Sequence, residues 1–65
     1  MDHETKDLIA QLCTRAGMIM EDASAEALTI ALQSESDLAA KLDTLIEAIA
    51  TSSSLLTAAR GLTPS

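Results

Sequence analysis

The chain has 65 residues, a formal net charge of −6 and no aromatic residue. This length allows one domain at most, over residues 1–65, and the single cysteine excludes an intrachain disulfide. The negative charge argues against binding to nucleic acid, because contacts with phosphates need clustered Lys and Arg.

Composition points to an all-α fold. The apolar residues are Ala, Leu, Ile, Met and one Cys, and these favour helix, whereas strands favour β-branched and aromatic residues. We expect three helices, in the order long, short, long, with the two long helices packed antiparallel in a hairpin-like arrangement.

The first predicted helix spans about residues 3–21, with Asp2 as its N-cap. Apolar residues follow the helical period through and beyond Gly17, so we expect a continuous helix although Gly costs about 1 kcal/mol relative to Ala. Cys13 lies within this apolar arc, and a free Cys usually behaves as a small buried hydrophobe. We therefore expect the thiol to be buried.

The second predicted helix spans about residues 25–33, after candidate caps at Asp22 and Ser24. It is apolar on two nearly opposite faces. A helix that is apolar nearly all round is buried on more than one side, and a second subunit is the simplest source of that cover.

The third predicted helix spans about residues 35–60, after a weak capping box between Ser34 and Asp37. Gly61 suits a left-handed position after the helix end, with Leu62 folding back, and Pro64 prevents the helix from resuming. This helix is predicted to be longer than the first, which leaves part of it uncovered. The alternative, in which the second and third helices form one rod, is disfavoured by a shift of about 80° in the apolar stripe.

An apolar stripe on the third helix predicts association. Its members recur at spacings of four and three, interrupted by Ser52, and so lie on one side of the helix. A chain this short, without a disulfide or a metal site, usually needs a partner subunit or very regular packing. We expect a homodimer that forms a helical bundle, with an interface of Leu28, Ile30, Leu38, Leu42, Leu45, Ile49 and Leu56.

No catalytic, cofactor or metal site is predicted. His3, Glu4 and Asp7 would share one face of a fraying first turn, which makes a poor metal site without supporting partners. Ser36 at a helix start in an acidic helical chain vaguely resembles the acyl carrier proteins, in which such a serine carries phosphopantetheine. The Asp-Ser-Leu order is absent, since Asp37 follows Ser36, and we do not assign the chain to that family.

These observations favour a non-enzymatic protein–protein interaction module, a small regulator or adaptor. We expect it to bind a second copy of itself, and the sequence does not identify any other protein partner. One alternative is an acidic inhibitor that binds a basic protein through Glu21, Asp22, Glu26, Glu35, Asp37, Asp43 and Glu47. A remote alternative is a carrier modified at Ser36. The acidic N-terminus is unlike a secretory signal and no apolar run is long enough to span a membrane, so we expect a cytoplasmic protein without a membrane partner.

Overall fold

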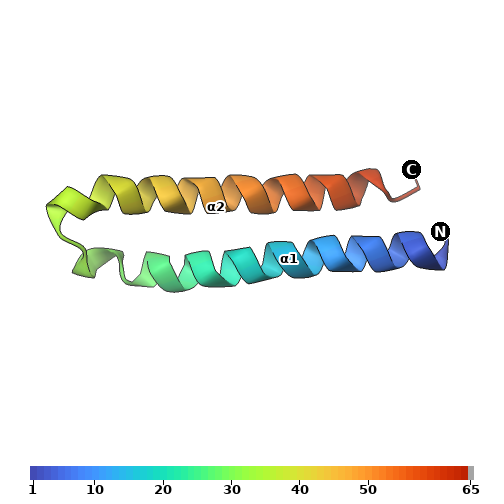
Figure 1. The fold of residues 1–65 in the computed structure, drawn as a ribbon, viewed down its shortest axis with the longest axis horizontal. Coiled ribbons are helices and arrows are strands. Elements are labelled where there is room, and N and C mark those ends of the chain that lie inside the picture. Colours follow the sequence, from blue (N-terminus) through green and yellow to red (C-terminus); the bar gives the residue numbers. More distant parts are fainter. Residues whose placement is uncertain (65) are drawn as a thin grey trace.

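The protein is a hairpin of two antiparallel helices in a computed structural model that describes residues 1–64. Helix α1 (His3–Leu28) is followed by a short 3-10 helix, η1 (Ile30–Leu32), and by helix α2 (Glu35–Gly61). The two long helices lie side by side, with both termini at one end and the turn at the other (Figure 1). Residues 1–64 contain no strand, so the all-α prediction is confirmed.

The prediction of a separate second helix is wrong. Helix α1 continues past Asp22 and Ser24 to Leu28, and only the three residues of η1 remain of the expected element. No Gly or Pro stands between Gly17 and the turn, and the segment is rich in Ala, which favours helix most. A residue with capping potential therefore does not end a helix whose neighbours all favour its continuation.

The predicted difference in helix length is also wrong. Helix α1 has 26 residues and α2 has 27, and at 1.5 Å per residue both are about 40 Å long. Neither helix extends far beyond the other. The continuity of α1 through Gly17 and the turn before α2 are both confirmed.

A side chain caps the start of α1 but not the start of α2. The carboxylate of Asp2 accepts a hydrogen bond from the backbone N–H of Thr5, with 2.7 Å between the two atoms. This bond lowers the pKa of Asp2 below its usual value of 3.8. At α2 the predicted capping box is absent, because the Ser34 side chain makes no hydrogen bond to a backbone N–H of the first turn; the Ser34 hydroxyl instead donates to the Asp37 carboxylate at 2.9 Å.

The end of α2 differs from the prediction. Gly61 is the last residue of the helix, and Leu62 after it has φ −85°, in the right-handed region, so the left-handed position expected of Gly61 is absent. Instead, the N–H groups of Leu62 and Thr63 bond to carbonyls three residues earlier, each at 3.1 Å. Such turns satisfy the last carbonyls of a helix without a residue at positive φ.

The two helices meet along a seam of small and aliphatic residues, which we call the inner seam. Its members recur every four and three residues, the heptad spacing that keeps one side of a helix facing its partner. They are Thr5, Ile9, Leu12, Ala16, Ile19 and Ala23 of α1, and Leu38, Lys41, Leu45, Ala48, Ser52, Leu55 and Ala59 of α2. All are buried or half-buried.

Small residues occupy the most enclosed part of the inner seam. Only Ala16, Ala23, Ala59 and Ser52 are buried, and no large side chain in residues 1–64 is fully buried. The Ser52 hydroxyl donates a long hydrogen bond, 3.5 Å, to the backbone carbonyl of Ala16 on the other helix. Ser52 therefore does not interrupt the pattern: with Ala16 opposite, it allows the two helix backbones to approach closely.

Candidate interaction face

Large apolar side chains continue round α2 beyond the inner seam. Leu42, Ile49 and Leu56 each follow an inner-seam residue by four positions, which turns them by about 40° towards one side of the hairpin. Their exposed fractions are 48%, 57% and 40%. We call these three residues the outer row. They recur every seven residues, as in a second heptad stripe that the described chain covers only in part.

Two shallow grooves on this side connect the outer row to α1. One, of about 440 Å³, is lined by Met20, Ile49, Ser52, Ser53, Leu56, Thr57 and Arg60. The other, of about 280 Å³, is lined by Met20, Ala23, Ser24, Ala27, Leu45 and Ile49. Met20 and Ile49 line both, so the grooves form one surface that runs along the hairpin.

The seven-residue spacing extends this surface towards both ends. Gly17 and Ala10 precede Ser24 by seven and fourteen residues, Cys13 precedes Met20 by seven, and Ile46 precedes Ser53 by seven. Residues at such spacings share one side of a helix in a hairpin of this kind. We define the apolar face as Ala10, Cys13, Gly17, Met20, Ser24 and Ala27 of α1 with Leu42, Ile46, Ile49, Ser53 and Leu56 of α2.

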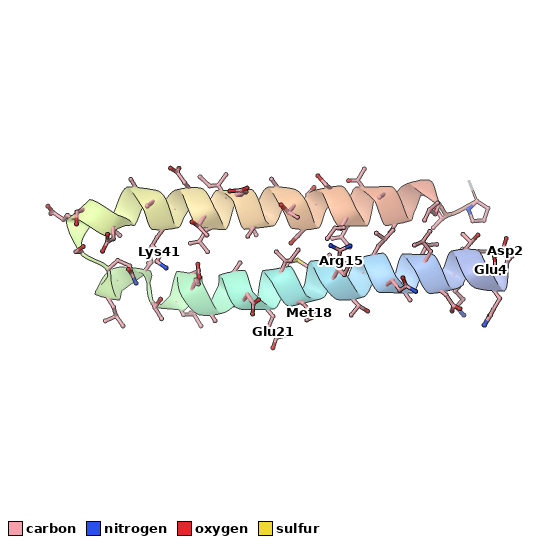
Figure 2. The ribbon with its side chains drawn as sticks, in the orientation of Figure 1. Asp2, Glu4, Arg15, Met18, Glu21 and Lys41 are labelled. Atoms are coloured by element: carbon pink, nitrogen blue, oxygen red, sulfur yellow. The ribbon has the colours of Figure 1, made fainter. Side chains whose placement is uncertain are left out.

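The opposite side of the hairpin is polar. A groove there is lined by Ile19, Asp22, Ala23, Glu26, Thr44, Leu45 and Ala48, which includes two carboxylates. Figure 2 shows Met18 and Glu21 pointing away from α2 altogether. The large exposed side chains of α2 in the outer row therefore lie on the opposite side of the hairpin from the Asp22 and Glu26 carboxylates.

The structure divides the seven predicted interface residues into three groups. Leu42, Ile49 and Leu56 lie together on the apolar face. Leu38 and Leu45 are half-buried in the inner seam, against α1 of the same chain. The other two, Leu28 and Ile30, lie at the turn, where Leu28 is 84% exposed and Ile30 is half-buried.

The predicted interface contains only the outer row of the apolar face. The largest side chains that it misses are Met20, which is 40% exposed, and Ile46, which is 67% exposed. One pattern in the sequence could have identified the inner side of α1. From Thr5 to Ala23, small and aliphatic residues recur at strictly alternating spacings of four and three residues. That seam leaves Met20 and Cys13 one position outside it.

The expected burial of Cys13 is wrong, because the thiol is exposed on the apolar face. In a two-helix hairpin, each helix covers only part of its neighbour's surface. This covered part is narrower than the arc over which the apolar residues of the helix are spread. Cys13 falls just beyond the edge of the covered part.

The other candidate sites lie at the ends of the hairpin. The His3 imidazole is 3.7 Å from the Asp7 carboxylate, and both side chains are largely exposed. Within residues 1–64, no three His, Cys, Asp or Glu side chains are placed to hold a metal ion together. The Ser36 hydroxyl is 3.1 Å from that of Ser34 in the exposed first turn of α2.

No helix within the described part of the chain has the length and apolar character needed to cross a bilayer. Comparison of the chain with protein-family models, with curated proteins and with solved structures gives no match.

Proposed function

We propose that the protein is a non-enzymatic helical interaction module that acts as a homodimer. Two copies pair through the apolar face, and the remaining helical surfaces of the resulting bundle are free to contact another protein. The observation that carries the proposal is the outer row, three large aliphatic side chains at heptad spacing that are 40% to 57% exposed.

The poor core of a single hairpin supports this proposal. The buried residues of the described chain are three alanines and one serine. A chain of 65 residues has little apolar area to bury, and chains of this size often rely on a partner subunit when they lack disulfides and metals. Covering the outer row would add large side chains to the core.

The size of the face also suits a dimer. The hairpin measures 50 Å by 15 Å between Cα atoms, so one side offers about 750 Å². A stable protein interface buries about 800 Å² on each partner. The apolar face therefore provides the area of a standard interface only if a partner covers most of its length, as a second copy of this rod would.

Sedimentation equilibrium of two matched variants tests the proposal. Ile49→Glu places a carboxylate in the centre of the apolar face, whereas Ala50→Glu places the same charge on the next, exposed residue of α2, which lies outside the face. We expect the wild type and Ala50→Glu to be dimers at micromolar concentration and Ile49→Glu to be a helical monomer. A wild type that remains a folded monomer at these concentrations would contradict the proposal.

A second candidate, an acidic module for a basic protein, is favoured by the placement of the carboxylates. The seven acidic residues from Glu21 to Glu47 are all exposed. All of them except Glu35, at the turn, lie outside the heptad positions of the apolar face. Association with a basic protein that weakens steeply with added salt, and that Ile49→Glu leaves intact, would support this second role.

A further inference from the structure

The two helices contribute side chains of different size to the apolar face. Apart from Met20, α1 contributes Ala10, Cys13, Gly17, Ser24 and Ala27, all of them small. Helix α2 contributes the outer row together with Ile46, all of them large, and a single small residue, Ser53. The edge of the face along α1 is therefore recessed, and the edge along α2 protrudes.

A second copy can cover this face with two-fold symmetry in two ways, since symmetric dimers use the same patch on both subunits. With the axis along the hairpin, α1 of each copy lies on α2 of the other, and both turns are at the same end. With the axis across the hairpin, α1 lies on α1 and α2 on α2, and the turns are at opposite ends. Both arrangements bury the same residues.

Side-chain volume separates these arrangements. When α1 covers α2, the small side chains meet the large ones at both edges of the interface, and the two hairpins can pack at an even separation. When α1 covers α1 and α2 covers α2, the two outer rows collide along one edge of the interface. The small residues of the two α1 helices then leave a gap along the other edge. Protein interiors are close-packed, and both overpacking and voids are unfavourable.

Charges at the ends favour the other arrangement, but weakly. Glu35 precedes the outer row at the turn, whereas Lys6 and Arg60 lie near the termini, so turns at opposite ends would bring opposite charges together. Exposed ion pairs contribute little and are screened by salt. The match of volumes extends along the whole face and outweighs these end contacts.

We propose that a second copy of this chain covers the apolar face with its turn at the same end, so that α1 of each copy packs on α2 of its partner. This inference rests on the proposed homodimer. It makes Gly17 a specificity residue: a Cβ built there points into open space rather than against α2 or a side chain of α1 outside its chain neighbours, and in the proposed dimer the partner fills this space.

Distances between spin labels test the arrangement in the full chain. In a Cys13→Ala background that sediments as the wild type does, a label at Ser36→Cys marks the turn and a label at Glu4→Cys marks the termini; both labelled positions are exposed and lie outside the face. We expect the Ser36 labels of a dimer to be roughly 20–35 Å apart, the width of two helix layers plus the labels. The same range is expected for Glu4, in low and in high salt.

Opposite turns would place each pair of labels nearly 50 Å apart, the length of the hairpin, and would overturn the arrangement while leaving the homodimer intact. Absence of any coupling between labels, with a monomer in sedimentation, would overturn the proposed function itself.

Gly17→Leu provides a second test. Leu favours helix more than Gly does and has room in a single hairpin, so we expect the helical circular dichroism to be retained. In the proposed dimer it meets the large side chains of the partner, and we expect the dissociation constant to rise about tenfold or more. Ala25→Leu, exposed on α1 outside the face, is the matched control and should leave the constant unchanged. A dimer unaffected by Gly17→Leu would overturn the proposed packing.

Discussion

Helix α2 carries two neighbouring apolar stripes with different fates. The inner-seam positions Leu38, Leu45, Ser52 and Ala59 face α1 and are half-buried or buried. The outer row lies about 40° further round the same helix and is exposed. The covered stripe ends in two small residues, whereas the exposed stripe consists of large ones throughout.

This difference separates folding from association. Small residues in the inner seam bring the two helices close together, but they bury little apolar area. The large residues, which could bury more, are turned to one side. The most enclosed contacts of the hairpin are thus made by small side chains, while the large side chains of the outer row remain exposed, and this contrast is the physical basis of the proposed homodimer.

The largest difference in stability is expected between two variants that each place a charge on one of the stripes. Leu45→Asp places an unpaired charge within the inner seam, and we expect the free energy of unfolding to fall by about 3 kcal/mol, enough to unfold so small a chain. Leu42→Asp, on the outer row, should leave a helical hairpin that no longer dimerises. Urea denaturation followed by circular dichroism, together with sedimentation, measures both. Equal loss of helix in the two variants would contradict the division into two stripes.

Enlarging the closest contact gives the next largest effect. Ser52 is 2% exposed against Ala16, so Ser52→Leu should force the helices apart and lower the free energy of unfolding by about 1–3 kcal/mol. Ser54→Leu adds the same side chain at an exposed position two residues away and should change stability little. Thermal denaturation of the two variants provides the comparison. A stabilised Ser52→Leu would show that the helices do not need small residues there.

Replacing Lys41, the one charged residue of the inner seam, is expected to have a smaller effect and to increase stability. The Lys41 side chain lies between the two helices near the turn (Figure 2), is half-buried and makes no ion pair with any described residue. Lys41→Leu should therefore raise the free energy of unfolding, by about 1 kcal/mol. Chemical denaturation against an Arg15→Leu control, which changes an exposed charge outside the apolar face, measures the gain. A loss of stability in Lys41→Leu would mean that the ammonium group has a stabilising contact.

The smallest effect is expected at Asp2, which belongs to neither stripe. Its pKa is lowered in the folded chain because the carboxylate accepts the Thr5 N–H bond. This contribution to stability is therefore fully present above the usual pKa of 3.8 and is lost as the pH falls through the lower, folded value. The stability difference between the wild type and Asp2→Ala should shrink as the pH falls below about 4. A difference that is independent of pH would contradict the cap.

The local features of this protein could be predicted from the order of its residues. Helix-favouring composition gave the all-α fold, the in-phase apolar period carried α1 through Gly17, and the polar Ser34-Glu35-Ser36 segment marked the turn before α2. Each of these depends on residues close in the chain, so periodicity and propensity were sufficient. The same reasoning failed at Gly61, where a favoured left-handed conformation was available but a simple i→i+3 turn sufficed.

Which apolar residues face inward became clear only from the packing of the two helices. Leu38 to Leu56 read as a single stripe in the sequence, and the position of α1 divides it into Leu38 and Leu45 inside and the outer row outside. The same contact leaves Cys13 and Met20 on the surface. The physical reason is geometric: a helix covers only a narrow arc of its neighbour, and where that arc lies depends on the close approach of Ala16 and Ser52, residues 36 positions apart in the chain.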